Sequence, residues 1–174
     1  MTAYFAAGGL KEAAAMVQVR RAVHRDIDAL AKLTAEASAE VGAPSALEPE
    51  RIRAHGFSAN PLFEAWIAEE RQGKPPCGHA FVSRSYDIRR ACPVMVLSEL
   101  YVRPEQRRSG LARLILSAVA RRAVEVGARE IMITTGVDNA VAQRFFAAVG
   151  AQPRQAAVYV MAADGIQWLA TEGL

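Results

Sequence analysis

The stretch that decides the fold is Pro93–Leu116, PVMVLSELYVRPEQRRSGLARLIL. Its first ten residues are rich in β-branched and apolar side chains and predict the strongest strand of the chain, 93–102. From Ser109 the apolar positions change to a helical period, which predicts a helix over 109–126 that ends at Gly127. An arginine-rich turn containing Gly110 separates the two elements. The stretch therefore predicts a strand, a tight turn and a long helix.

The turn itself has the chemistry of an anion site. The N-terminus of a helix leaves backbone N–H groups unpaired and carries partial positive charge. Gly110 lacks a Cβ, Ala112 is small, and arginine side chains can fork onto phosphate oxygens. Neither the G-x-G-x-x-G nor the G-K-[ST] phosphate motif is present. The turn alone fits a phosphate or pyrophosphate site, and it equally fits a solvated arginine turn.

Outward from this stretch, strand and helix patterns alternate. The predicted order is β-α-α-β-β-β-α-β-α-β-β, an α/β fold with a mixed sheet of six to seven strands and helices on both faces. Asp164-Gly165 is expected to be the turn of the last hairpin, 156–171. The other predicted strands are 17–23, 63–70, 77–86 and 129–135, and the other helices begin near Asp26, Glu48 and Asn139.

Composition bounds the class of protein. The 174 residues with a net charge of +3 predict one globular domain, 17–174, after an N-terminal extension, 1–16. Cys77 and Cys92 fall at opposite ends of the hairpin 77–102, so a disulfide is not expected and a cytoplasmic location is the default. No apolar run reaches the length of about 18 residues that a membrane span needs.

The chain resembles the GNAT acyltransferase superfamily. Arg107, Gly110 and Ala112 fill the fixed positions of its acyl-CoA signature [QR]-x-x-G-x-[GA]. The helix 139–150, which an Asn caps and a Gly ends, is similar to the family's second segment, and Val19-Arg20-Arg21-Ala22 to its opening.

The resemblance implies acetyl-CoA as cosubstrate. No metal is expected, because His24, His55 and His79 lie in three different elements without metal-ligand spacing. The pyrophosphate of acetyl-CoA would lie on the amides of 107–112, and its pantetheine arm where strand 93–102 splays from strand 129–135. Asn139 would contact that arm, although a plain helix cap explains it as well. The implied cofactor-binding residues are Leu100, Tyr101, Val102, Arg107, Arg108, Ser109, Gly110, Leu111, Ala112, Asn139 and Phe146.

Two positions depart from the family pattern. Many members carry a tyrosine that protonates the leaving thiolate where this chain has Phe146, and a phenyl ring donates no proton. Segments such as Gly78-His79-Ala80 look like the diamine and polyamine acetyltransferase branch, but that branch has its glutamate at the position of Ser98. Polyamine specificity is therefore not assigned.

The candidate general base is Glu99. Strand alternation places Leu97, Glu99 and Tyr101 on one face, which flanks this carboxylate with an apolar and an aromatic neighbour and suits it to accept a proton from an amine. It could instead hold a cationic substrate or pair with an arginine. Tyr101 is the substitute proton donor, or a ring packed on the sheet.

Three functions fit the sequence. The first is an N-acetyltransferase acting on a primary amine of a small molecule, diamine- or amino-acid-like, or of a peptide. The second is an acyl-CoA-binding sensor without turnover. The third, a basic nucleic-acid-binding domain, lacks aromatic residues among its arginines to stack on bases, so no nucleic acid partner is expected. No membrane partner is expected either, and a homodimer is predicted from an exposed last strand.

Overall fold

The computed structural model describes residues 17–70 and 74–172. The predicted extension 1–16 lies outside these residues. The chain divides into two compact units, Met1–Thr134 and Thr135–Leu174. The single domain expected over 17–174 stays a prediction.

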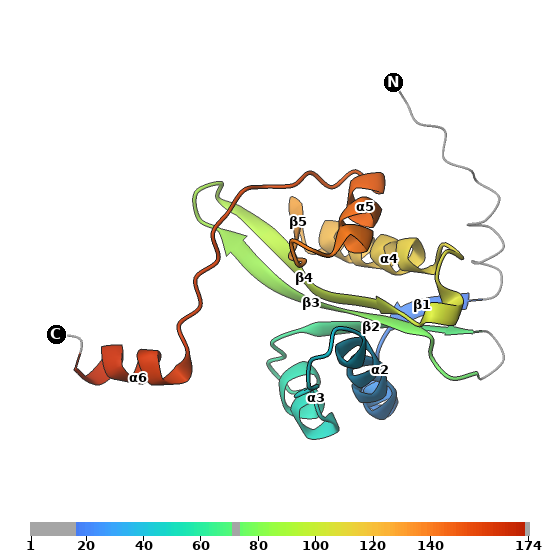
Figure 1. The fold of residues 1–174 in the computed structure, drawn as a ribbon, viewed down its shortest axis with the longest axis horizontal. Helices are drawn as coiled ribbons and strands as arrows, with labels where there is room; N and C mark the ends of the chain where they lie inside the picture. The colour runs from blue at the N-terminus through green and yellow to red at the C-terminus, as the bar shows by residue number, and fades with distance from the viewer. Residues whose placement is uncertain (1–16, 71–73, 173–174) are drawn as a thin grey trace. The chain divides into compact units, whose positions relative to one another are not determined.

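The first unit contains a five-stranded mixed sheet in the order β1-β2-β3-β4-β5 (Figure 1). Neighbouring strands are antiparallel except β4 and β5, which are parallel. The mixed α/β class is confirmed, with five strands in the described residues where six to seven were predicted. The strands are β1 Val17–Arg21, β2 Glu64–Glu70, β3 Gly78–Asp87, β4 Cys92–Val102 and β5 Glu130–Ile133.

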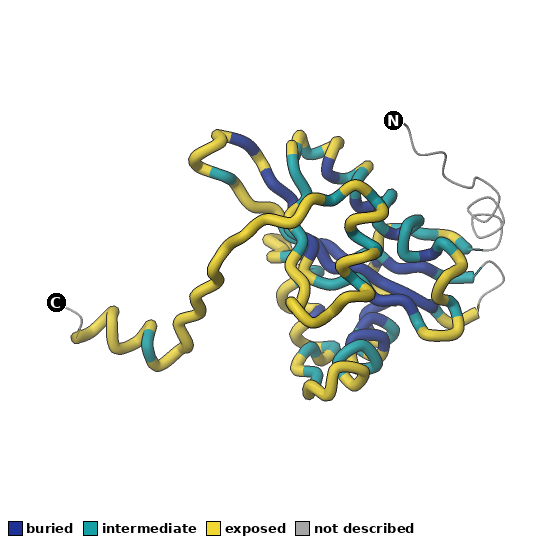
Figure 2. The backbone as a smooth tube through the Cα atoms, turned by 45° about the horizontal axis from the view of Figure 1, so that its top comes forward, coloured by how far each residue is buried: buried dark blue, intermediate teal, exposed yellow. Residues whose placement is uncertain are grey.

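Helices cover both faces of this sheet, as predicted (Figure 1). Helices α2 (Ile27–Glu40) and α3 (Pro49–Gly56) pack on one face through a core that includes Leu30, Ile52 and Phe81. Helix α4 (Leu111–Glu125) lies on the other face, where Ile115 is fully buried. Figure 2 shows that the buried residues concentrate in the central strands and the helix sides turned toward them. Two short 3₁₀ turns, η1 (His24–Asp26) and η2 (Pro104–Gln106), precede α2 and follow β4.

A β-bulge interrupts β4 at Ser98. Phe81 pairs with Glu99 and Val82 pairs with Leu97, so Ser98 has no partner on β3. Phe81 and Val82 are consecutive and point to opposite faces, and so do their partners Glu99 and Leu97. The prediction that Leu97 shares a face with Glu99 is therefore wrong. Glu99 and Tyr101 do share a face, since they pair with Phe81 and His79.

The second unit contains α5 (Ala140–Ala148) and α6 (Ala163–Thr171). The hairpin predicted over 156–171 is wrong, because residues 151–162 form no regular element and Asp164-Gly165 lies in the first turn of α6. An aspartate there interacts favourably with the positive end of the helix. Ile166, Leu169 and Ala170 follow at helical spacing. This period, rather than the turn-forming dipeptide, determined the structure.

Two further observations concern the described residues. Cys77 and Cys92 are both free, as expected, because they lie at opposite ends of the antiparallel β3–β4 pair. In the described part of the chain, no helix combines the length and apolar character that crossing a membrane requires.

Candidate active site

The turn between β4 and α4 has a backbone shaped to hold an anion. Arg108 and Gly110 both adopt left-handed conformations, with φ of 61° and 89°. The first hydrogen bond of the helix runs from the Leu114 N–H to the Gly110 carbonyl, at 3.1 Å. The amides of Leu111 and Ala112 precede that bond, so they have no partner one turn earlier in the helix. Left-handed residues just before the unpaired amides of a helix start are a backbone arrangement that favours anion binding.

The side chains of this turn contribute less than its backbone. Leu111 is buried at 1% exposure and packs in the core, so only its amide faces the turn. The Ser109 hydroxyl donates to the Gln106 carbonyl at 2.6 Å and stiffens the loop. Arg108 is exposed. The Arg107 N–H already donates to the Pro104 carbonyl at 3.2 Å, so residues 108–112 offer the main-chain donors, with a cationic rim.

Arg107 is tied to α2. Its Nη2 donates to both carboxylate oxygens of Glu40, at 2.7 and 2.6 Å, and its Nε donates to the Val102 carbonyl at 2.8 Å. The guanidinium also lies 5.8 Å from the centre of the Tyr101 ring. The residue that the signature assigns to the cofactor is thus in contact with the helix on the opposite face of the sheet.

Beyond the bulge, β4 has no partner on its β5 side. The parallel ladder ends where Leu97 pairs with Ile133, and β4 continues to Val102. Within the described residues, this leaves the β5 side of residues 98–102 without a strand. An edge of main-chain N–H and C=O groups is a suitable partner for an extended amide-containing molecule. Leu100 and Val102 lie along this edge.

Glu99 is held by a buried histidine. The Nε2 atom of His79 on β3 lies 2.5 Å from Oε1 of Glu99, and His79 is completely buried. The Glu99 side chain is 33% exposed, so it is partly accessible to solvent. The expected contact with an apolar Leu97 is absent because of the bulge, and the aromatic neighbours come from His79 and Tyr101, whose rings lie 5.8 Å apart.

Tyr101 is buried and its hydroxyl donates to Oε1 of Glu40 at 3.1 Å. Burial and the neighbouring Glu40 carboxylate raise the pKa of Tyr101 to about 12. The hydroxyl therefore keeps its proton at neutral pH. The protonated hydroxyl is able to donate a proton, although its O–H bond points toward α2.

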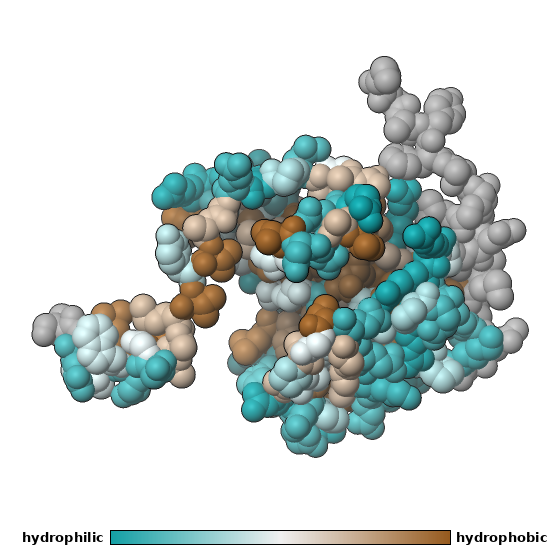
Figure 3. All heavy atoms as spheres, viewed as in Figure 1, coloured by the Kyte–Doolittle hydropathy of each residue, from teal (hydrophilic) through white to brown (hydrophobic). Residues whose placement is uncertain are grey.

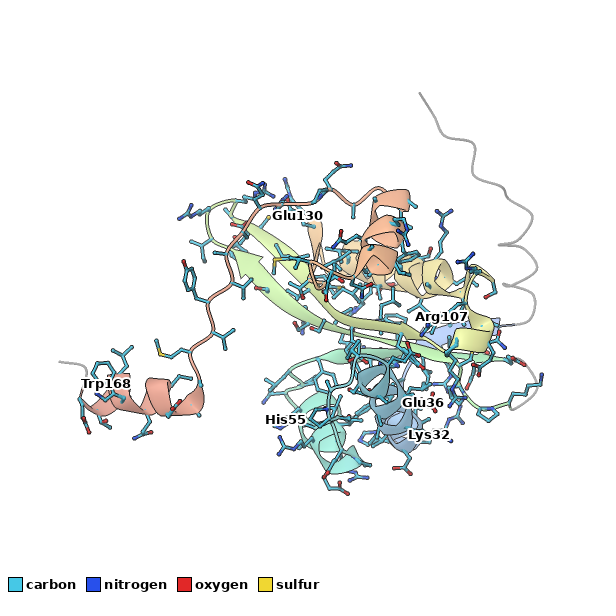
Figure 4. The ribbon with its side chains drawn as sticks, in the orientation of Figure 1. Lys32, Glu36, His55, Arg107, Glu130 and Trp168 are labelled. Carbon is cyan, nitrogen blue, oxygen red and sulfur yellow. The ribbon has the colours of Figure 1, made fainter. Side chains whose placement is uncertain are left out.

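A second carboxylate of α2 is paired in the same way. Glu36 accepts two hydrogen bonds of 2.8 Å from Arg103, and this contact lowers the pKa of Glu36. Figure 4 shows Glu36 on α2 and Arg107 on the loop after β4 at the same end of the sheet. Hydrophilic residues dominate the surface here in Figure 3. Glu36 and Glu40 of α2 thus each bind an arginine that follows β4.

The second unit contains the last two predicted site residues. The side chain of Asn139 accepts from the Ala142 N–H at 3.0 Å and caps α5, as predicted from the sequence. Phe146 is on α5, where its ring meets that of Phe145 edge-on at 5.2 Å. That these two residues meet the cofactor stays a prediction.

Glu36 and Glu40 were expected from the family resemblance to border the acceptor side, whereas the contact between His79 and Glu99 was not predicted. His79 and Glu99 are 20 positions apart, and their contact depends on the β3–β4 register. Glu40 and Arg107 are 67 positions apart. The available signal was the strand alternation, which places His79 and Phe81 on the same face of β3.

Comparisons with known proteins agree with this geometry. The profile of the Acetyltransferase (GNAT) family matches residues 28–151. The thialysine N-epsilon-acetyltransferase of Bos taurus is 27% identical over 146 residues, which cover 79% of this chain and 85% of that protein.

Solved structures share the fold. An integron cassette protein from V. cholerae superposes with a TM-score of 0.75 at 17% identity, covering 90% of this chain and 99% of the other. The aminoglycoside N-acetyltransferase AAC(6')-Iy in complex with CoA gives a TM-score of 0.69 at 21% identity, over 84% and 95% of the two chains.

Proposed function

Because the chain belongs to the GNAT acetyltransferase family, we propose that it transfers the acetyl group of acetyl-CoA to a primary amine of a small molecule or a peptide. The family match covers residues 28–151 and so includes both the turn and Glu99. The single observation that carries the proposal is the joint placement of these two features. The turn with its two left-handed residues follows directly after β4. Glu99 lies on β4, four residues before the turn begins at Arg103.

In this proposal the amides of residues 108–112 bind the diphosphate of the cosubstrate. Gly110 allows close approach because it has no Cβ, and its φ of 89° disfavours any other residue. The pantetheine arm would add along the β5 side of residues 98–102. Leu100, Tyr101 and Val102 then contact the cosubstrate through their backbone.

Glu99 acts in the proposal as the general base. The ammonium group of the acceptor must lose a proton before it attacks the thioester carbonyl, and the solvent-facing oxygen of Glu99 accepts that proton directly or through a water. The new amide bond forms as the carbon–sulfur bond breaks, and the thiolate leaves. Tyr101 is the candidate donor to that thiolate.

The absence of a tyrosine at Phe146 does not remove the catalytic power of the site. General acid assistance is worth about 10²- to 10⁴-fold in rate. Holding two reactants together supplies about 7–11 kcal/mol, which is the larger effect. A thiol with a pKa near 8.5 also leaves tolerably well at neutral pH without a donor.

A non-catalytic acyl-CoA sensor is the second candidate function, and Phe146 favours it. Such a protein keeps the turn and dispenses with the thiolate donor. Glu99 is evidence against it, because a partly exposed carboxylate oriented by a buried histidine has no role in binding a diphosphate.

Steady-state release of free CoA thiol across a panel of amines separates the two functions. The panel includes monoamines, diamines, amino acids, an aminoglycoside and peptides with free N-termini. We expect acceptor-dependent thiol release. Saturable acetyl-CoA binding without turnover on any amine would instead establish the sensor.

The homodimer and the cytoplasmic location also stay proposals. The exposed last strand on which the dimer was predicted is not formed in the described residues. Sedimentation equilibrium with and without acetyl-CoA measures the oligomeric state directly.

A further inference from the structure

His79 is the most unusual polar group in the first unit. It is a side chain with two ring nitrogens, it is completely buried, and it points to the face where α2 packs. Buried polar groups normally have hydrogen-bond partners. One nitrogen of His79 meets this rule through Glu99, and the other, Nδ1, has no hydrogen-bond partner in the described structure.

The unpartnered Nδ1 atom determines which protonated form of the ring fits the site. A proton on Nδ1 would create a buried N–H without an acceptor, which is costly. The neutral tautomer with its proton on Nε2 leaves only an unused lone pair at Nδ1. It also makes the 2.5 Å contact a hydrogen bond from Nε2–H to the Glu99 carboxylate. The ring is fixed further by Phe81, whose centroid is 5.0 Å away at a steep angle.

From this arrangement we infer that His79 is a positioning residue for acetyl transfer, which orients Glu99 by binding one carboxylate oxygen and leaves the other oxygen turned toward the acceptor amine. The inference rests on the role proposed for Glu99. A donated hydrogen bond stabilises the charged form of a carboxylate, so Glu99 is kept ready to accept a proton. The proton taken from the amine stays on Glu99, because His79 has no acceptor for a second N–H.

The neighbouring titratable groups do not replace this contact. The Tyr101 hydroxyl on β4 donates a hydrogen bond to Glu40, and Glu36 on α2 is paired with Arg103. Tyr101, Glu36 and Glu99 each interact with His79 in the described structure. The Glu99 carboxylate therefore depends on His79 for its hydrogen bond within the described part of the chain.

The test compares two replacements of His79. His79→Gln retains an N–H at the position of Nε2 but cannot titrate, and His79→Phe retains a ring of similar size without a donor. We expect His79→Phe to lower kcat/KM at neutral pH at least tenfold. We also expect it to move the acid limb of the plot of kcat/KM against pH to higher pH. His79→Gln should retain most of the activity, and the acid limb of its pH profile should lie where it does in the unchanged protein. Acetyl-CoA affinity should stay within twofold in both, and His55→Phe on the exposed side of α3 is the matched control.

The inference is overturned if both variants fold and His79→Gln is no more active than His79→Phe, or if the pH profile of His79→Phe is unchanged. In a Glu99→Gln background, His79→Phe should cause no further loss, since the partner is already absent. An equal loss in that background would mean that His79 acts through another group.

A measurement independent of activity completes the test. The ¹⁵N chemical shifts of the His79 ring should report the Nε2–H tautomer under the assay conditions, and a proton on Nδ1 would refute the inference. If no amine in the panel is acetylated, acetyl transfer is refuted, and the tautomer of His79 can still be measured. A normal pH profile in His79→Phe refutes the role of His79 and leaves acetyl transfer intact.

Discussion

Two clusters of acidic side chains in the first unit differ in how their acids are paired and in how exposed the most buried acid is. In the closed cluster, which contains Arg20, Asp26 and Glu69, Arg20 binds both acids through four hydrogen bonds of 2.6–2.9 Å, and the side chains of Asp26 and Glu69 are 8% and 27% exposed. In the open cluster, which contains Glu36, Glu40 and Glu99, each carboxylate is about one-third exposed.

The difference separates structure from function. The closed cluster joins β1, the start of α2 and β2, and the Val23 N–H also donates to Asp26 at 2.7 Å, so its acceptors are filled. The open cluster lies beside the anion-binding turn, and each of its acids has a surface that a substrate can reach. Changes in the closed cluster should affect stability, and changes in the open one should affect chemistry.

The largest effect is expected at Glu99. Glu99→Gln keeps the shape and removes the proton acceptor, so turnover at neutral pH should fall at least tenfold, toward the range of about 10²- to 10⁴-fold for loss of a general base. Acetyl-CoA affinity should not change, because the turn is intact. Initial rates and calorimetry measure the two quantities. Unchanged turnover would remove Glu99 from the mechanism.

The next effect is on folding. Arg20→Met leaves Asp26 and Glu69 without their cation, and the free energy of unfolding should fall by about 3 kcal/mol, as for a buried pair that loses one partner. The matched control is Arg103→Met, which breaks an equally bidentate pair whose acid is more exposed, and it should cost about 1 kcal/mol or less. Urea denaturation compares them. Equal losses would contradict the distinction between the clusters.

Acid should weaken the closed cluster. The hydrogen bond from Arg20 lowers the pKa of both Asp26 and Glu69. A carboxyl group whose folded pKa is depressed contributes stability that is complete above its unfolded pKa, about 4, and is lost as the pH falls through the folded value. The free energy of unfolding should therefore decline below about pH 5. Asp26→Asn should flatten that decline, and an unchanged slope would exclude Asp26 as a source of it.

The smallest effect is expected at Glu40. This residue holds Arg107 beside α2, so Glu40→Gln should free the guanidinium for the diphosphate and tighten acetyl-CoA binding a few-fold. Glu36→Gln releases Arg103 instead and is the control. Calorimetric titration of both variants with acetyl-CoA measures whether only Glu40→Gln binds more tightly. Weaker binding in Glu40→Gln would show that the pair supports the turn.

Local patterns predicted the elements well. Strand β4 was expected over 93–102 and spans Cys92–Val102, and the helix expected over 109–126 is Leu111–Glu125. Gly127 has a φ of 71°, which agrees with its predicted place after that helix. These features depend on spacing within one turn or strand, and sequence displays such spacing directly.

What the sequence did not reveal depends on register or on competing local preferences. The bulge at Ser98 adds one residue to β4, and the alternation of side chains along the sequence does not reveal it. Because of this extra residue, Leu97 and Glu99 lie on opposite faces of the sheet. The contact between His79 and Glu99 needs the observed strand pairing. At the C-terminus, the Asp164-Gly165 turn signal competed with a helical period, and the helix formed.

The most direct test of the account is calorimetric titration with acetyl-CoA and, in parallel, with acetyl-pantetheine, which lacks the diphosphate. The account predicts saturable binding of acetyl-CoA, with affinity at least tenfold weaker for acetyl-pantetheine and for acetyl-CoA binding to Gly110→Val. Equal affinity for the two thioesters, or no heat with acetyl-CoA, would contradict the claim that the turn at the head of α4 holds the cosubstrate.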